Sequence, residues 1–177
     1  MTGIDQALMR RFVALAADAL CGEWVIMGGA VLPLLGIEDR VTWDIDVAGP
    51  PDAKLDQALV LMEIAERLGL PIEAINQAGA FFLHRIDGWH DGLVPLHAGK
   101  SAAILRPDAT LFVRLKLDRL TESDLADCVA MLGAARRLGE PVRGRQLAAA
   151  IDVALGGGGL VAERRVRLEA LRRLFPD

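Results

Sequence analysis

Two aspartates, Asp44 and Asp46, stand one residue apart in a segment that alternates polar and apolar side chains over residues 42–48. Alternation with a period of two is typical of a β-strand, in which both carboxylates point to the same face. Neighbouring carboxylates repel each other, and a hard divalent cation such as Mg²⁺, which prefers oxygen ligands, removes that repulsion. The pair is therefore a candidate metal site.

A pair of glycines, Gly28 and Gly29, follows a short apolar run over residues 23–27 and precedes an apolar stretch over residues 30–35. The pattern predicts a strand, a glycine turn and a short buried helix. Because the glycines lack side chains, a phosphate can approach the backbone there, and the following helix offers its N-terminal amides. A phosphate site beside a metal-binding carboxylate pair is what transfer of a nucleotidyl group requires.

The elements that position these residues are predicted to be helices with a few buried strands, since aliphatic residues dominate and aromatic residues make up only 5% of the chain. Helices are expected at residues 4–20 and 52–68. The inward face of the second helix is predicted to carry Leu55, Leu59, Met62 and Leu68. Short strands are expected at residues 70–75, 80–86 and 93–98, with the loop 87–92 joining the last two as a hairpin.

The chain after Pro107 is predicted to be entirely helical. The expected helices cover residues 108–119, 122–138, 144–155 and 161–174. A capping signal over residues 121–124 starts the second of them. Four consecutive glycines, residues 156–159, predict a flexible link that lets the last helix pack at its own angle or not at all. We therefore expect an α/β core over residues 1–106 and a helical region over residues 107–177 packed on it.

The overall charge restricts the partners of the chain. Its 177 residues carry a formal net charge of −4, which argues against broad DNA or RNA binding because that mode needs many Lys and Arg side chains. The longest nearly apolar run, residues 24–37, is too short to span a membrane and contains glycines and a proline. A secretory signal pattern is not apparent, so a cytoplasmic location is expected. Cys21 and Cys128 match no metal or redox spacing and are predicted to be buried thiols.

The two motifs together resemble the signature of nucleotidyltransferases of the DNA polymerase beta type. The resemblance is carried by the segment Val-Ile-Met-Gly-Gly-Ala over residues 25–30 and by Arg40, Thr42, Asp44, Ile45 and Asp46. More narrowly, the chain is similar to the abortive-infection nucleotidyltransferase-like toxins and related uncharacterised bacterial proteins. A weaker second feature is a Lys-Leu run over residues 115–119 followed by an Asp-Leu-x-Asp helix over residues 123–127.

The resemblance, which covers residues 22–132, implies an α+β fold with a small mixed sheet flanked by helices. It also implies that Asp44 and Asp46 hold Mg²⁺ and that the phosphates of a nucleoside triphosphate lie over the glycine pair. The residues implied to line the nucleotide are Gly28, Gly29, Arg40, Thr42 and Lys116, with Arg40 and Thr42 at the site entrance. The implied reaction transfers a nucleoside monophosphate to a hydroxyl of a protein or RNA acceptor, and toxin-like relatives imply an antitoxin partner.

Members of this family use a third carboxylate on a later strand. Here the expected strand, residues 93–98, places Pro95 or His97 near that position, which leaves Asp87 or Asp91 in the preceding loop as alternative ligands. Two further hypotheses follow from the missing strand carboxylate. Besides the transferase, the chain could be a catalytically inactive nucleotide-binding or partner-binding module, or a protein whose helical half docks a partner while the aspartate pair is vestigial.

Two clusters have alternative interpretations. His84, His90 and His97 invite a zinc interpretation, but their spacing matches no known ligand pattern, which favours surface histidines. The last helix carries five arginines, which form either a solvated face or a surface that binds RNA or an acidic partner. They are Arg164, Arg165, Arg167, Arg172 and Arg173.

Overall fold

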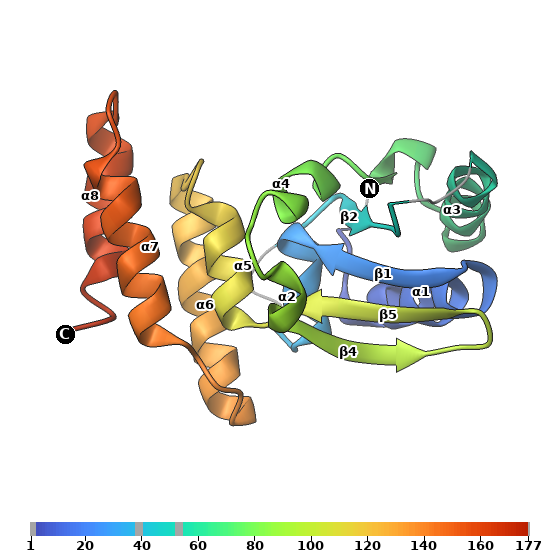
Figure 1. Ribbon diagram of the computed structural model, residues 1–177. Coiled ribbons are helices and arrows are strands. Elements are labelled where there is room, and N and C mark those ends of the chain that lie inside the picture. Colours follow the sequence, from blue (N-terminus) through green and yellow to red (C-terminus); the bar gives the residue numbers. More distant parts are fainter. Residues whose placement is uncertain (1–2, 38–40, 52–54, 177) are drawn as a thin grey trace. The chain divides into compact units, whose positions relative to one another are not determined.

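The computed structural model of the chain describes residues 3–37, 41–51 and 55–176 (Figure 1). The chain divides into two compact units, residues 1–107 and 108–177. The first unit combines a mixed β-sheet with helices and the second is built from helices, so the predicted α+β class is confirmed. Within the described ranges, none of the helices is both long and apolar enough to cross a membrane.

Within the described part of the first unit, the sheet has five strands in the order β3-β2-β1-β5-β4. The strands are β1 (Gly22–Met27), β2 (Ile45–Ala48), β3 (Ile75–Asn76), β4 (Leu93–Ala98) and β5 (Ala102–Pro107). The central strand β1 pairs antiparallel with β2 and parallel with β5. Strand β3 extends the sheet parallel to β2, and β4 closes the other edge antiparallel to β5. Both candidate motifs therefore lie on neighbouring strands.

The register of β1 and β2 assigns their side chains to two faces. Ile26 pairs with Val47, and these two side chains are buried on one face. Met27 pairs with Asp46 and Val25 pairs with Ala48, so these four side chains belong to the opposite face. The candidate carboxylate Asp46 therefore shares its face with the apolar side chains of Val25 and Ala48.

Helix α1 (Gln6–Ala19) and helix α3 (Leu55–Leu68) are the long helices of this unit. The carboxylate of Asp5 caps α1 by accepting from the N–H of Leu8 at 2.8 Å, and α1 packs against α3, β4 and β5. The predicted inward face of α3 is wrong for three of its four residues: Leu55, Leu59 and Met62 are exposed. Its buried residues are Leu61, Ile64, Ala65 and Leu68. Two apolar stripes run along this helix, and the sequence alone does not say which one meets α1.

The segment between Ala80 and Pro107 differs most from prediction. Residues 80–86 do not form a strand: Ala80–His84 is helix α4, followed by the 3₁₀ turn η3 (Trp89–Gly92). The hairpin instead joins β4 to β5, and β5 was missed. In a short apolar run, the spacing of the hydrophobic residues does not distinguish a strand from a helix. Strand β5 is flanked by β1 and β4, and a strand buried on both faces lacks the polar alternation that identifies a half-exposed one.

The described residues of the second unit, 108–176, form four helices, each close to its predicted position. They are α5 (Ala109–Lys116), α6 (Glu122–Leu138), α7 (Gly144–Gly156) and α8 (Ala162–Arg172). The predicted capping signal is a capping box, in which Thr121 accepts from the N–H of Asp124 while Asp124 accepts from the N–H of Thr121. The buried cluster of this unit consists of Val113, Leu117, Leu120, Cys128, Leu147, Ile151, Leu168 and Leu171.

Helix α8 packs within this unit despite the four glycines before it. Leu168 and Leu171 are fully buried. The guanidinium of Arg164 donates to the carbonyl of Leu117, and that of Arg167 donates to the carbonyl of Leu120 at 2.6 Å. Arg172 donates to Asp152. Three of the five arginines therefore hold α8 in place through contacts inside the unit.

The two cysteines lie in different environments. Cys128 is buried as predicted, but Cys21 is exposed, so that prediction is wrong for Cys21. Cys21 occupies the short turn between α1 and β1, where its N–H donates to the side chain of Gln57 at 2.9 Å. A residue in a turn after a helix can expose its side chain to solvent, and the spacing of the two cysteines in the sequence does not indicate this.

We expect a thiol reagent such as Ellman's reagent to modify Cys21 in the native protein and to reach Cys128 only after unfolding. Burial raises the pKa of the Cys128 thiol to about 12; the charge of Lys116 lowers it, and those of Asp127 and Asp124 raise it. The thiolate is the reactive form, and only about one part in ten thousand of the Cys128 thiol is thiolate at pH 8, so its reaction is slow. Absorbance titration with and without urea measures both thiols. Rapid labelling of native Cys21→Ser protein would contradict this assignment.

Candidate metal and phosphate site

The glycine turn and the second aspartate are in direct contact. Strand β1 ends at Met27, and Gly28 begins the 3₁₀ turn η1 (Gly28–Ala30), which leads into the short helix α2 (Val31–Leu34). Gly28 has φ +61°, a left-handed conformation that favours glycine. A Cβ at this position would overlap the carboxylate oxygen Oδ2 of Asp46. The absence of a side chain at Gly28 therefore makes room for the Asp46 carboxylate.

The second glycine, Gly29, lies against Thr42, which precedes the two aspartates in the sequence. A Cβ at Gly29 would lie 3.1 Å from the hydroxyl oxygen of Thr42. The carbonyl of Thr42 accepts from the N–H of Ile4 at 2.9 Å, which ties this segment to the start of the chain. Thr42 is buried, so its side chain lies against the turn rather than at the site entrance, where the resemblance would put it.

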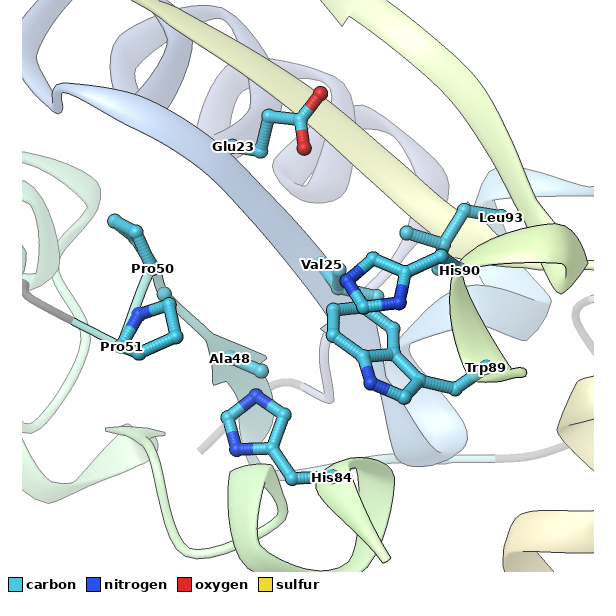
Figure 2. Close-up of a pocket in the computed structure, with 10 residues that line it drawn as sticks. Glu23, Val25, Ala48, Pro50, Pro51, His84, Trp89, His90 and Leu93 are labelled. Atoms are coloured by element: carbon cyan, nitrogen blue, oxygen red, sulfur yellow. The ribbon is translucent and has the colours of Figure 1, made fainter. Parts of the chain in front are cut away.

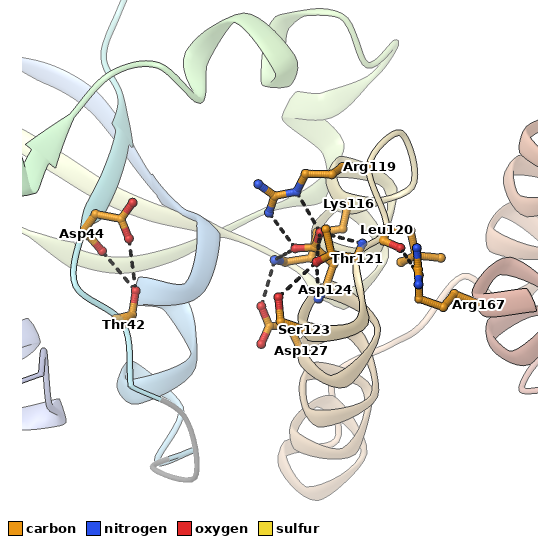
Figure 3. Close-up of polar contacts among 10 residues, drawn as sticks. All are labelled: Thr42, Asp44, Lys116, Arg119, Leu120, Thr121, Ser123, Asp124, Asp127 and Arg167. Carbon is orange, nitrogen blue, oxygen red and sulfur yellow. Dashed lines mark hydrogen bonds and ion pairs between the residues drawn. The ribbon is translucent and has the colours of Figure 1, made fainter. Parts of the chain in front are cut away.

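Asp44 is linked to the turn through Thr42. The Thr42 hydroxyl donates to the carboxylate oxygen Oδ1 of Asp44 at 3.3 Å and lies 3.4 Å from its carbonyl oxygen (Figure 3). Asp44 is exposed and precedes β2, which begins at Ile45 and is therefore shorter than the predicted strand over residues 42–48. Asp46 lies within β2 and is half-buried. Asp46 therefore contacts the glycine turn directly, whereas Asp44 is linked to it through Thr42.

The donor set at this turn fits Mg²⁺. Carboxylate oxygens are ligands that Mg²⁺ prefers, and it commonly uses one or two of them together with phosphate oxygens and water. The carboxylate of Asp46 lies against the backbone of Gly28, and the Thr42 hydroxyl lies against that of Gly29. The residues present could therefore hold the metal without a third protein carboxylate.

The strand order decides where a third ligand could come from. Strand β4, which carries Pro95 and His97, is separated from β2 by β1 and β5, so neither residue lies beside Asp46. The outer neighbour of β2 is β3, and Asn76 of β3 is in register with Asp46. The Asn76 side chain accepts from the N–H of Ala78 at 3.1 Å. An amide thus occupies the strand position next to Asp46 where a third carboxylate would be sought.

The predicted strand over residues 70–75 is wrong except at Ile75, because residues 72–74 form the 3₁₀ turn η2 (Ile72–Ala74) and β3 consists of Ile75 and Asn76. Asn76 was missed because the prediction stopped one residue short of it and its partner strand was unknown. The signal available was weak: Asn76 is the first polar residue after the apolar Ala74 and Ile75. Sequence spacing places a residue on a strand, but only pairing brings it beside another residue.

The loop aspartates lie in the segment after α4. Asp87 is in the turn between α4 and η3, and Asp91 is in η3 itself, with its Oδ2 3.6 Å from where a Cβ at Gly88 would be. Among the described residues, no group of three or more His, Cys, Asp or Glu side chains is arranged to hold a metal ion. The described residues therefore do not form a three-ligand metal site that includes Asp87, Asp91 or one of the three histidines.

Lys116 lies in the second unit, at the end of α5, where its ammonium is bound by two buried carboxylates. Its Nζ is 2.8 Å from Asp124 Oδ1 and 2.9 Å from Asp127 Oδ2 (Figure 3). Arg119 and the Thr121 hydroxyl also donate to Asp124. The two parts of the weaker sequence feature are therefore in contact, and the expected interaction of Lys116 with a triphosphate stays a prediction.

The surroundings of Asp124 shift the pKa of its carboxyl. Burial by itself raises its pKa, but the hydrogen bonds from Arg119 and Lys116, the charge of Lys116 and the Thr121 hydroxyl outweigh burial. The pKa of Asp124 is therefore held well below its ordinary value. Arg40, the remaining residue named by the resemblance, lies outside the described residues.

Comparison with known proteins does not assign a family. No protein-family model, no curated protein and no solved structure matches this chain. The assignment of a function therefore rests on the residues of the two motifs and on the contacts between them.

Proposed function

We propose that this chain is a nucleotidyltransferase-like protein with the nucleotidyltransferase fold, which transfers a nucleoside monophosphate from a nucleoside triphosphate to a hydroxyl of a protein or RNA. The observation that carries the proposal is the contact between the two motifs. The carboxylate of Asp46 lies against Gly28, and the hydroxyl of Thr42 lies against Gly29. The resemblance named these residues from their order in the sequence alone, and their meeting in space supports a common role.

In this proposal Asp44 and Asp46 hold Mg²⁺, and the turn at Gly28 and Gly29 receives the phosphates. Bound Mg²⁺ would neutralise charge on the phosphate oxygens and assist the displacement. The chain's own contribution is positional: the Thr42 hydroxyl orients Asp44, and the absent Cβ of Gly28 leaves space for Asp46. Preorganised charge of this kind supplies a large share of catalysis in phosphate chemistry.

A second candidate is a nucleotide-binding module of the same fold without turnover. The observation that favours it is Asn76, the amide in register with Asp46. A carboxylate can accept the proton of an acceptor hydroxyl, whereas an amide is neutral and serves poorly as a base. Both candidate functions require Asp44 and Asp46 for metal binding. They differ only in whether the nucleoside monophosphate is transferred to an acceptor.

Incubation with α-labelled nucleoside triphosphates, Mg²⁺ and cell extract is expected to label a protein or RNA, and the double variant Asp44→Asn/Asp46→Asn is expected to reduce transfer at least roughly 100-fold. The matched control is Asp87→Asn/Asp91→Asn, which also removes two carboxylates and should retain transfer. Circular dichroism confirms that each variant folds.

The outcomes separate the candidates. Transfer that persists in the Asp44/Asp46 variant would rule out the proposed site. Mg²⁺-dependent nucleotide binding without transfer in any extract would favour the binding module. In that case Asn76→Asp is the informative variant, because a third carboxylate beside Asp46 should strengthen Mg²⁺ binding in calorimetry.

A further inference from the structure

The first unit contains a cavity of about 340 Å³ that the candidate metal and phosphate site does not use. Cavities of this size accept small organic molecules. Figure 2 shows its lining, with His84, Trp89 and His90 turned toward strands β1 and β2. The lining residues are Glu23, Val25, Ala48, Gly49, Pro50, Pro51, His84, Trp89, His90 and Leu93.

The cavity lies on the same sheet face as Asp46. Val25 and Ala48 line it. Val25 precedes Met27 by two positions and Ala48 follows Asp46 by two positions, so in these antiparallel strands both are displaced in the same direction from the Met27–Asp46 pair. Two residues of a strand span about 7 Å. Helix α4, which packs on β2, begins after Gly79 and ends at His84. A Cβ at Gly79 would lie 3.7 Å from the Cβ of Asp46, whereas His84 lines the cavity.

Three of the residues that line the cavity carry aromatic rings and lie next to one another. Trp89 stacks on His90 with ring centroids 3.5 Å apart and an interplanar angle of 28°. The ring of His84 lies 5.4 Å from that of Trp89 and is tilted by 47°. Aromatic surfaces of this kind stack on nucleobases whatever their sequence, because every base has a π-face.

The polar groups of the cavity suit the edge of a heteroaromatic ring better than a phosphate. Imidazoles can donate and accept hydrogen bonds, and the carboxylate of Glu23 accepts them, as from the amino group of a base. Among the described residues that line the cavity, none is Lys or Arg. A phosphate there would meet a carboxylate without a lysine or arginine to neutralise it, so an uncharged planar ligand fits best.

We propose that this cavity binds a nucleobase, stacked against Trp89 and read at its edge by Glu23. The proposal rests on the proposed function for its biological setting, in which phosphates lie at Gly28 and Asp46 while a base lies further along the same face. The base belongs either to the nucleoside triphosphate or to an RNA acceptor. The shared chemistry is the uncharged ring, and free nucleosides test it without phosphate or metal.

The experiment titrates adenosine, guanosine, cytidine and uridine into the full chain without Mg²⁺, using calorimetry and saturation-transfer NMR. Trp89→Leu is expected to weaken binding about tenfold, since loss of one stacking surface has an effect of that order. The control is Phe81→Leu, which removes an exposed aromatic ring from α4 outside the cavity lining and should bind as wild type.

A second variant protects the test against misfolding of Trp89→Leu. Glu23 is exposed at the start of β1, so Glu23→Gln should fold. It is expected to reduce the preference for bases with an amino group, namely adenosine, guanosine and cytidine, over uridine. Absence of nucleoside binding to the wild type at millimolar concentration, or equal binding by wild type, Trp89→Leu and Glu23→Gln, would overturn the proposal.

Two further arms identify the source of the base and separate this proposal from the proposed function. If Trp89→Leu weakens binding of a Mg²⁺-nucleoside triphosphate, the base is that of the nucleotide. If it weakens only binding of a short oligoribonucleotide, the base is that of an acceptor. The Asp44→Asn/Asp46→Asn variant should bind nucleosides as wild type, so failure of label transfer leaves the cavity assignment standing.

Discussion

Replacement of Gly28 by alanine is expected to abolish Mg²⁺-dependent nucleotide binding while reducing the stability of the protein by only about 1–2 kcal/mol. The stability loss comes from the left-handed backbone at φ +61°, which an alanine adopts at a cost. The binding loss has a separate cause. The new Cβ would overlap Oδ2 of Asp46, and because that oxygen ends a rotatable side chain, the carboxylate swings away from the turn.

The matched control is Gly69→Ala. Gly69 has φ +70°, and a Cβ added there would meet no atom within 4 Å. The backbone strain is thus nearly the same, without a carboxylate to displace. Urea unfolding should give similar losses for both variants, whereas calorimetry with Mg²⁺ and a nucleoside triphosphate should detect binding only in Gly69→Ala. Equal nucleotide affinity in the two variants would refute the role assigned to the contact between Gly28 and Asp46.

The second large effect is expected from Lys116→Met, which should destabilise the protein by about 3–5 kcal/mol. The side chains of Asp124 and Asp127 are 0% and 1% exposed, and Lys116 is itself 10% exposed. Removing the ammonium takes away the cation that the two buried carboxylates share, so a large part of the interaction that compensates for burying their charge is lost. Urea unfolding at pH 7 measures the loss.

Arg119→Met is the control for this prediction. Arg119 also pairs with Asp124, but its side chain is 73% exposed, and solvent-exposed ion pairs contribute about 0–1 kcal/mol. A loss in Arg119→Met as large as that in Lys116→Met would contradict the assignment. If Lys116 served only to bind a triphosphate, Lys116→Met would instead lose nucleotide affinity with unchanged stability.

The same network predicts a dependence of stability on pH. The pKa of Asp124 in the folded protein lies below the value of about 3.9 expected in the unfolded chain. The unfolded state therefore binds the proton more readily, so this stabilisation is complete above about pH 5 and is lost as the pH falls below about 4. Lys116→Met should weaken this acid dependence, because one of the two cations that lower the pKa of Asp124 is gone while Arg119 stays.

Local signals in the sequence were sufficient for part of this protein. The capping box at Thr121 indicated the start of α6. The glycines at residues 28–29 indicated the end of β1, and the 3₁₀ turn η1 begins there. Both signals act between residues close in the chain, through a hydrogen bond or a backbone conformation. For the same reason Gly28, Gly29, Asp44 and Asp46 could be named as candidates from spacing alone.

The tertiary structure alone decided which candidates meet and what stands beside them. Residues 80–86 form α4 rather than a strand, β4 lies at the far edge of the sheet, and Asn76 rather than His97 is the neighbour of Asp46. Glu23 and Trp89, which are 66 positions apart in the sequence, line the same cavity. Strand order, register and the buried face of a helix depend on how segments distant in the sequence pack against each other. The residue pattern of one segment does not identify the segment against which it packs.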